Sequence, residues 1–376
     1  MESKTRSLIF RDKEALSPSY VPRQIRYREE QIDRLSRHVL RGRGPSLALV
    51  IGGRGTGKTL VCKKVFDDLS EKISPLTLYL DCRKDRSPGD IARALHSAVL
   101  PYEPLRGHST QALFLKALEA MKDEDGAMVV LDHADITLRL HPTSAFLLSR
   151  AEAWPTSPNP ILITIVIENL DTLSHLDSRA SSTFRRNLID FSSYSERELR
   201  RIVRQRVNDS FRKGAVSPKA LEACAEVAMG ENANAQYALD LLRDAGERAE
   251  RRGALVVEPT DIENSISEIP SAFSIHELGF LNNHESMILL SLTHVLTKQR
   301  SYVTTGQLER EYRERCRRLS RPTIRHTTLW KCVKTLEILR IIRTKISRRG
   351  FRGRTTLINP NFPSPQPIRT QLMRLL

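Results

Sequence analysis

The clearest chemical pattern in this sequence lies at residues 52–59, where GGRGTGKT fits the phosphate-binding pattern G-x-x-x-x-G-K-T without a mismatch. The apolar run 47–51 before it has the length of a short buried strand, and residues 60–66 after it have helical apolar spacing. A strand, a glycine-rich turn and a helix N-terminus together form a cradle of backbone N–H groups for an anion. The sequence therefore predicts a nucleoside triphosphate site in this segment.

Two side chains of this loop have predicted roles toward a triphosphate. Lys58 is expected to reach the β- and γ-phosphates, and the Thr59 hydroxyl is expected to hold Mg²⁺. A glycine-rich turn with an incidental lysine is the alternative, but it does not explain the strand and the helix on either side. The predicted nucleotide-binding residues of the loop are Gly52, Thr56, Gly57, Lys58, Thr59 and Leu60.

Apolar runs and helical segments alternate through residues 40–170. Each run is apolar along both faces of a strand, and helical spacing appears between runs, for example at 88–100 and 112–121. This order predicts an α/β fold whose parallel sheet is covered by helices on both faces and binds ligands at the C-terminal strand ends. The four runs are 47–51, 76–80, 127–131 and 161–167.

Polar residues follow the third and fourth runs. Asp132 stands where P-loop enzymes place the carboxylate that organises Mg²⁺. The next position normally holds a glutamate that polarises the attacking water, but here it holds His133. Because an imidazole lacks the charge and reach of a carboxylate, the sequence predicts slow or absent hydrolysis. Asn169 is a candidate for orienting the attacking water, with a turn-forming asparagine as the alternative.

Charge is concentrated at the C-terminal end of the chain. The chain has 376 residues and a net charge of +16, and residues 271–376 contain 20 Lys and Arg against 6 Asp and Glu. A basic segment attached to a nearly neutral one indicates a polyanionic partner. No apolar run approaches membrane-spanning length, and the five cysteines include no C-x-x-C pair, so we expect an intracellular protein with reduced thiols and no zinc site.

The basic segment has the pattern of a winged helix. Three helical segments at 284–296, 305–319 and 323–339 are followed by two β-type runs at 340–346 and 355–358. In the third helix, apolar residues at helical spacing predict a buried face and basic and hydroxyl residues predict a face for the major groove. The predicted core residues are Leu329, Val333, Leu336 and Leu339. The predicted DNA-contacting residues of this helix are Arg325, Thr327, Thr328, Lys331 and Lys334, with a merely solvated face as the alternative.

A cluster of arginines lies between the two β-type runs. Like charges so close together repel one another unless a polyanion is present, and arginines on a slim wing suit a narrow minor groove. The predicted wing residues are Arg348, Arg349, Arg352 and Arg354.

Several segments occur in the order found in one known family. They are 9–12 (IFRD), 16–22 (LSPSYVP), 26–31 (RYREEQ), 176–182 (LDSRASS) and 190–194 (DFSSY). With these motifs the chain resembles, nearly end to end, the archaeal origin-recognition/Cdc-type replication initiators of the AAA+ class. The resemblance implies an α/β P-loop AAA+ core at 1–192, an all-α lid at 193–270 and a C-terminal winged-helix domain at 271–376. The lid helices are expected at 196–211, 218–229, 235–252 and 259–269.

The resemblance also implies roles for individual residues. Arg179 matches the family's arginine finger, which approaches the γ-phosphate of a neighbouring subunit. The residues that the resemblance places around the nucleotide are Tyr20, Val21, Pro22, Arg28, Tyr194 and Arg206. The implied ligands are ATP or ADP with Mg²⁺, and the implied partners are origin-type double-stranded DNA, the replicative helicase and other initiator subunits, with no membrane.

The chain departs from the family pattern at the γ-phosphate end. Residues 233–236 are ANAQ where the family has Gly-Asp-Ala-Arg, so Gln236 replaces a sensing arginine. Together with His133 this suggests a divergent paralogue that binds nucleotide and hydrolyses it slowly or not at all. The family also touches DNA through an insertion in the core, which corresponds here to 83–107 with Arg86 and Arg106, although the segment also has the pattern of an ordinary helix and loop.

Three hypotheses follow. The leading one is a DNA-binding replication initiator in the cytoplasm, associated with the nucleoid, whose nucleotide acts as a structural switch. The second is a non-hydrolysing DNA-binding regulator of other initiators or of transcription, which the changes at His133 and Gln236 favour. The third is a signalling P-loop ATPase with a winged-helix module, against which the opening segment 20–28 argues.

Overall fold

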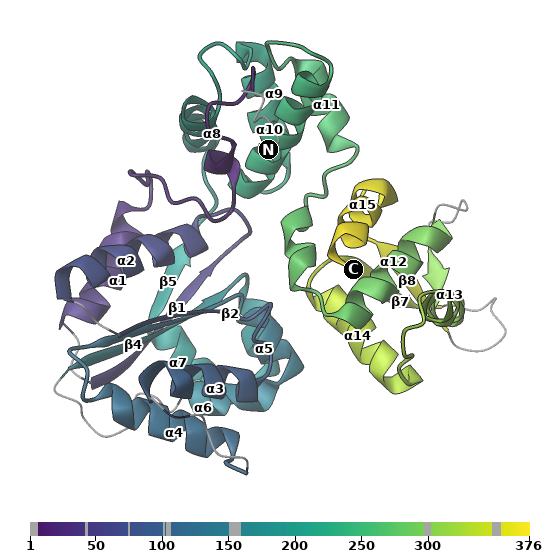
Figure 1. Ribbon diagram of the computed structural model, residues 1–376. Coiled ribbons are helices and arrows are strands. Elements are labelled where there is room, and N and C mark those ends of the chain that lie inside the picture. The colour runs from purple at the N-terminus through teal and green to yellow at the C-terminus, as the bar shows by residue number, and fades with distance from the viewer. Residues whose placement is uncertain are drawn as a thin grey trace. The chain divides into compact units, whose positions relative to one another are not determined.

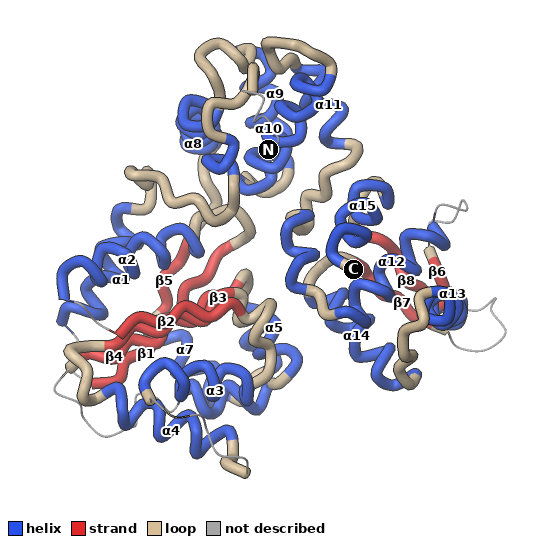
Figure 2. Tube along the Cα trace, in the orientation of Figure 1, coloured by secondary structure: helices blue, strands red, loops and turns tan. Residues whose placement is uncertain are grey.

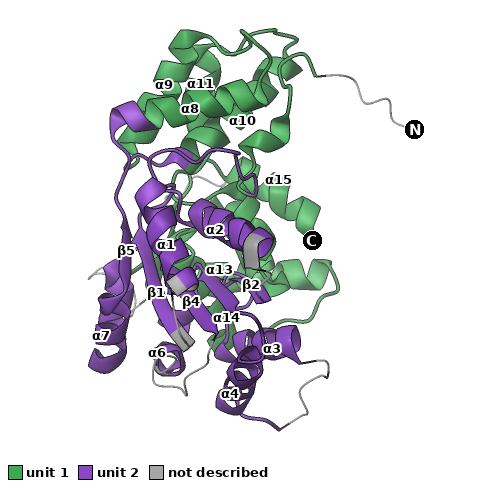
Figure 3. Cartoon of the chain, turned by 90° about the vertical axis from the view of Figure 1, so that its left-hand side faces the viewer, with its two compact units in different colours: residues 1–18, 199–231, 236–376 green, residues 19–198, 232–235 purple. Residues whose placement is uncertain are grey.

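The computed structural model describes residues 7–41, 44–73, 76–100, 102, 107–149, 159–296, 302–347 and 355–376. The chain forms two compact units (Figure 3). The sheet unit consists of residues 19–198 and 232–235, and the helical unit consists of residues 1–18, 199–231 and 236–376. Each unit is therefore assembled from segments that are discontinuous in the sequence.

The sheet unit is built around a five-stranded parallel sheet with the strand order β2-β3-β4-β1-β5 (Figures 1 and 2). Four strands coincide with the predicted apolar runs. Strand β5 has only 4 residues and contains an exposed aspartate, Asp190, so it forms no continuous apolar run. The strands are β1 (Gly44–Gly52), β2 (Leu76–Asp81), β3 (Ala127–Asp132), β4 (Pro160–Ile167) and β5 (Leu188–Phe191).

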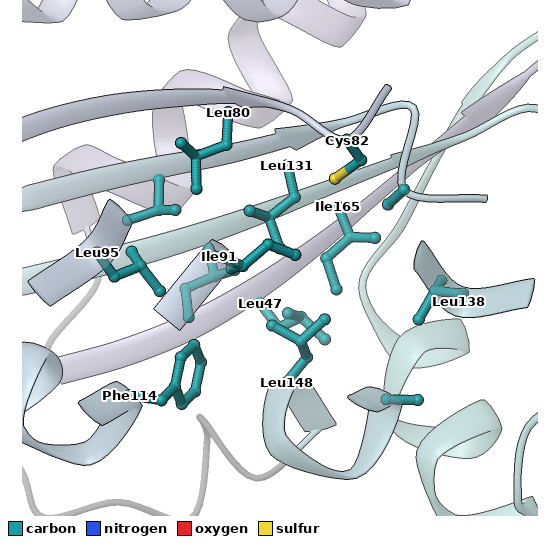
Figure 4. Close-up of a cluster of buried hydrophobic side chains, with 14 of the residues drawn as sticks. Leu47, Leu80, Cys82, Ile91, Leu95, Phe114, Leu131, Leu138, Leu148 and Ile165 are labelled. Carbon is teal, nitrogen blue, oxygen red and sulfur yellow. The ribbon is translucent and has the colours of Figure 1, made fainter. Parts of the chain in front are cut away.

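Helices cover both faces of this sheet, as the fully apolar strands predict. Leu47 and Leu49 of β1 lie in one buried cluster with side chains of α3 and α4, part of which Figure 4 shows. Ala48 and Val50, which point to the opposite face, lie in a second cluster with side chains of α1 and α2. The helices of the sheet unit are α1 (Glu29–Arg41), α2 (Lys58–Ile73), α3 (Pro88–Val99), α4 (Thr110–Met121), α5 (Asp135–Leu140), α6 (Ala145–Ser149) and α7 (Ser178–Arg186), with 3₁₀ turns η2 (Pro142–Ser144) and η4 (Leu170–His175).

The first part of the helical unit contains four helices, close to the segments predicted for the lid. Each starts near a residue that suits a helix N-terminus; for example, the Ser217 side chain accepts the N–H of Ala220 at the start of α9. The helices are α8 (Glu196–Ser210), whose first turn belongs to the sheet unit, α9 (Pro218–Gly230), α10 (Ala235–Arg251) and α11 (Pro259–Ile266).

The N-terminal segment 7–18 packs on these lid helices. The ring centroids of Phe10 and Phe211 are 4.9 Å apart, and the Arg212 N–H donates to the Ile9 carbonyl at 3.0 Å. The turn η1 (Lys13–Leu16) follows, and Lys13 forms an ion pair of 2.7 Å with Glu247 of α10. Segment 7–18 therefore belongs to the same compact unit as the lid helices.

The last part of the helical unit has the winged-helix order of elements. Its antiparallel sheet has the strand order β6-β8-β7. The two-residue strand β6 and the last helix, α15, lie outside the predicted elements, and α14 begins at His326 because Arg325 is its extended N-cap. The elements are η5 (Ile275–Phe280), α12 (Asn283–Leu296), β6 (Val303–Thr304), α13 (Thr305–Arg318), α14 (His326–Ile338), β7 (Ile342–Ile346), β8 (Thr356–Pro360) and α15 (Pro365–Leu375).

Two further predictions about the whole chain can be compared with the structure. All five cysteines are buried and none forms a disulfide. Within the described ranges, no helix has both the length and the apolar character needed to cross a membrane.

Gly246 of α10 provides a test of the packing of segment 7–18. A Cβ atom there would lie 2.4 Å from Phe10 and 2.9 Å from Phe211. We expect Gly246→Val to displace Phe10, to lower the free energy of unfolding of the lid by roughly 1–3 kcal/mol, and to speed tryptic cleavage at Lys13. Gly230→Val is the matched control, because nothing lies within 4 Å of that position. If trypsin cleaves at Lys13 at the same rate in both variants, the assigned packing of segment 7–18 on the lid helices is contradicted.

Candidate nucleotide-binding site

The phosphate-binding loop connects the end of β1 with the start of α2. Gly55 and Gly57 have φ angles of +70° and +89°, a region that glycine occupies without strain. A Cβ atom at Gly57 would lie 2.7 Å from the Tyr194 hydroxyl, and one at Gly55 would lie 2.2 Å from Oδ1 of Asn234. The loop is therefore held closely on two sides, and only glycine fits at these two positions.

Lys58 is folded back onto the loop. Its ammonium group donates to the carbonyls of Gly52 and Gly53 at 2.7 and 2.8 Å. Burial lowers the pKa of Lys58, and the nearby carboxylates, of which Glu168 acts most strongly, oppose this effect. A buried cation beside a cradle of backbone N–H groups is suited to an anionic ligand.

Asp132 is the most constrained carboxylate of the site. It is 2% exposed, and it accepts hydrogen bonds from the Thr59 hydroxyl at 2.7 Å, from the backbone N–H of His133 at 2.9 Å and from the Tyr79 hydroxyl. Burial alone would raise the pKa of Asp132, but the charge of His133 and the hydrogen bonds from the Tyr79 and Thr59 hydroxyls hold it below the ordinary value. The carboxylate is therefore ionised next to the Thr59 hydroxyl.

His133 turns toward Asp132. Its φ angle is +54°, a region in which histidine is more common than most residues, and its Nε2 atom lies 3.9 Å from Oδ2 of Asp132. The position after Asp132 thus places an imidazole against the Asp132 carboxylate.

Asn169 caps a turn after β4. Its Oδ1 atom accepts the N–H of Asp171 at 2.7 Å, at the start of η4. This is the turn-forming role considered from the sequence, and a role for Asn169 in orienting water stays a prediction.

Arg28 ties three parts of the sheet unit together. Its guanidinium group donates to the carbonyls of Thr56 in the loop, of Tyr27 and of Ser192 beyond β5, at 2.9, 2.9 and 2.7 Å. The same group lies 4.0 Å from the centre of the Tyr194 ring, and both residues are buried. Arg28 and Tyr194, carried over as nucleotide-contacting residues, are thus in contact with the phosphate-binding loop.

The other residues carried over from the family lie in other segments of the chain. Of the opening segment, Pro22 is buried, whereas Tyr20 and Val21 are partly exposed. Arg179 is exposed on α7. Arg206 and Gln236 belong to the helical unit, where Arg206 donates to the Ala15 carbonyl at 3.4 Å and Gln236 donates to Asp240 at 2.9 Å.

An ion pair beside the loop was not identified from the sequence. Nη1 of Arg54 lies 3.8 Å from Oε1 of Glu168, and both side chains are about 15% exposed. Arg54 occupies a variable position of the loop pattern, and Glu168 is the first residue after β4. The signal that could have identified Glu168 is its place at a strand end next to the loop.

The candidate DNA-contacting face of α14 is largely exposed. Arg325, Thr327, Thr328 and Lys331 are exposed, whereas Lys334 forms an ion pair of 2.7 Å with Glu337 and lies 5.2 Å from the Trp330 ring. The predicted core residues are buried as expected, and they are Leu329, Val333, Leu336 and Leu339. The wing arginines Arg348, Arg349, Arg352 and Arg354, and Arg106 of the core insertion, lie outside the described residues.

Arg86 lies in an ordinary helix-capping region. Its side chain donates to the Arg83 carbonyl at 2.6 Å, just before the capping box of Ser87 and Asp90 that starts α3. This geometry matches the helix-and-loop interpretation of the segment, and a DNA contact by Arg86 stays a prediction.

Three family models match successive parts of the chain. An AAA domain matches residues 41–203, a Cdc6 AAA+ ATPase-type lid domain matches residues 200–267, and a CDC6 C-terminal winged helix domain matches residues 277–366. The order of these matches agrees with the order of elements in the structure.

Similar proteins match along nearly the whole chain. ORC1-type DNA replication protein 1 of Sulfurisphaera tokodaii is 30% identical over 366 residues, which cover 96% of this chain and 92% of that protein. ORC1-type DNA replication protein 2 of Saccharolobus solfataricus is 28% identical over 387 residues, which cover 98% and 94%. The Aeropyrum pernix ORC1 protein, solved in complex with DNA, matches with a TM-score of 0.73 and 26% identity over 99% of this chain and 100% of that one. The chain belongs to the family of ORC1-type DNA replication proteins, which are AAA+ replication initiators with a C-terminal winged helix.

Proposed function

We propose that this protein binds ATP or ADP and origin-type double-stranded DNA, hydrolyses ATP slowly, and helps to recruit the replicative helicase. The observation that carries the proposal is the phosphate-binding loop, with Lys58 bonded inside it and the Thr59–Asp132 pair beside it. Membership of the ORC1-type family supports the initiator role.

Nucleotide binding follows from the contacts of the loop. When the nucleotide binds, the Lys58 ammonium group gives up its hydrogen bonds to the Gly52 and Gly53 carbonyls and donates to β- and γ-phosphate oxygens instead. The negative charge of these oxygens offsets the free-energy cost of burying the lysine charge. Arg28 and Tyr194 hold the shape of the loop, and residues 20–22 cover the adenine.

The pair Thr59 and Asp132 fits Mg²⁺. Its hydroxyl and carboxylate oxygens are 2.7 Å apart, both are the hard donors that Mg²⁺ prefers, and phosphate oxygens and water complete such a site. Within the described residues, no cluster of three or more His, Cys, Asp or Glu offers a metal site made by the protein alone. When bound, Mg²⁺ supplies neutralisation of the charge on the phosphate oxygens.

Slow hydrolysis follows from the residue types at positions 133 and 236. His133 places an imidazole against Asp132 and leaves its own position without a carboxylate for water. Gln236 replaces a cation and is bonded to Asp240, so it adds no positive charge for the transition state. Asn169 assists by orienting water, and Arg179, exposed on α7, serves the nucleotide of a neighbouring initiator subunit.

DNA binding rests on the winged-helix part. The sequence-predicted face of α14 enters the major groove, and the wing arginines enter the minor groove. The similarity to Aeropyrum pernix ORC1, whose structure contains DNA, supports this assignment. We propose domain limits of 1–192, 193–270 and 271–376, and a place at the nucleoid.

ATP turnover tests the nucleotide half of the proposal. We expect the wild type to hydrolyse ATP slowly but above a Lys58→Ala blank, both with and without duplex DNA. His133→Glu is expected to raise turnover by about tenfold or more, because a carboxylate at that position activates water. Turnover in the wild type that His133→Glu does not increase would contradict the assigned effect of His133.

DNA titrations at several salt concentrations test the DNA-binding half of the proposal. We expect Lys331→Ala to weaken binding to all duplex sequences and to reduce the slope of log K against log [salt] by about one. Arg374→Ala is the control, because it removes one positive charge from an exposed site on α15 of the same domain. Equal slopes for Lys331→Ala and the wild type would exclude a phosphate contact by Lys331.

A further inference from the structure

Glu168 lies at the strand end where the parts of the nucleotide site converge. Strand β4 pairs with β1 on one side, with Ile51 opposite Ile167, and with β3 on the other, with Leu131 opposite Ile165. Because all three strands are parallel, the residue after β4 lies between the phosphate-binding loop after β1 and the Mg²⁺-type carboxylate at the end of β3. That residue is Glu168.

The backbone and the side chain of Glu168 are both held in place. Its N–H donates to Oδ2 of Asp135 at 2.8 Å, and Oδ1 of Asp135 accepts from the Thr172 hydroxyl at 2.6 Å. Its carboxylate lies 3.8 Å from the Arg54 guanidinium of the loop. Glu168 is therefore fixed beside the loop by two independent contacts.

The Glu168 carboxylate lies at the edge of the sheet that carries both the phosphate-binding loop and Asp132. This carboxylate pairs with Arg54 inside the loop, and the backbone N–H of Glu168 is held by Asp135, three residues after Asp132. Lys58 is the residue that contacts the β- and γ-phosphates in such loops. Because Arg54 and Lys58 belong to the same loop, an acidic side chain paired with Arg54 lies in the region where the attacking water must be oriented.

We propose that Glu168 supplies the water-activating carboxylate that position 133 lacks. This inference rests on the proposed binding of ATP. The Glu168 carboxylate accepts a proton from the attacking water as the water oxygen bonds to the γ-phosphorus. The bond between the γ-phosphorus and the β–γ bridging oxygen breaks, and ADP and phosphate are released.

Arg54 has a positioning role in this step. Its guanidinium holds the Glu168 carboxylate at 3.8 Å and, as part of the loop, lies where phosphate oxygens compete for it. Binding of the triphosphate draws Arg54 to the phosphates and leaves Glu168 available to water. A carboxylate in this place that did not act on water would only repel the γ-phosphate and favour ADP over ATP.

The test measures both turnover and affinity in the full-length protein. Glu168→Gln is nearly isosteric and removes only the charge and basicity of the side chain. We expect its kcat for ATP to fall by about tenfold or more, with the Kd values for ATP and ADP changed by less than about threefold. Glu71→Gln, which removes an exposed carboxylate at the far end of α2, is expected to leave both quantities unchanged.

A double variant separates a chemical role of Glu168 from a structural one. We expect His133→Glu to restore turnover in the Glu168→Gln background, because the carboxylate then returns to the usual position. If Glu168→Gln leaves turnover unchanged, the inference is overturned. Tighter ATP binding in that variant would then show that the Glu168 carboxylate only repels the γ-phosphate. ATP binding without wild-type turnover above the Lys58→Ala blank would overturn this inference and the proposed slow hydrolysis but not the proposed nucleotide binding. Absence of ATP binding would overturn the proposed nucleotide binding as well.

Discussion

The position of β4 between β1 and β3 determines where every polar group of the site can lie. Parallel strands end at the same edge of a sheet, so the loop after β1, Asp132 at the end of β3 and Glu168 after β4 are brought together by register alone. The strands themselves are buried on both faces, and this burial keeps the register unique because no polar face offers an alternative. The site thus depends on apolar residues that never contact a ligand.

The phosphate-binding loop would not keep its shape from its own sequence. Its glycines allow the unusual backbone angles but favour none of them over others in the unfolded chain. Arg28 supplies the missing constraint, because a planar cation can bond to several carbonyls at once while it stacks on Tyr194. Arg28, which the family resemblance assigns to the nucleotide, therefore also supports the loop.

Sequence patterns were informative where one physical signal dominated. Continuous apolar runs located four of the five strands, and helical spacing located the lid and most of the winged helix. The elements β5, β6 and α15 were not predicted, because each is short or lacks such a signal. Glu168 was not identified from the sequence for a different reason. Its proposed role depends on which strands become neighbours, and no single segment of the sequence determines the strand order. The ion pair of Arg54 likewise depends on three-dimensional proximity, whereas the capping role of Asn169 is local and was among the alternatives that the sequence offered.

The division of the chain into two discontinuous units has a topological consequence. The backbone passes between the sheet unit and the helical unit after residues 18, 198, 231 and 235. A lid joined by one linker could be removed by one cut or exchanged with the lid of another molecule. Here a single break in the backbone leaves the two units covalently joined through the remaining crossings. Any motion of the lid must be shared among several tethers, which favours a limited, reproducible displacement over free swinging.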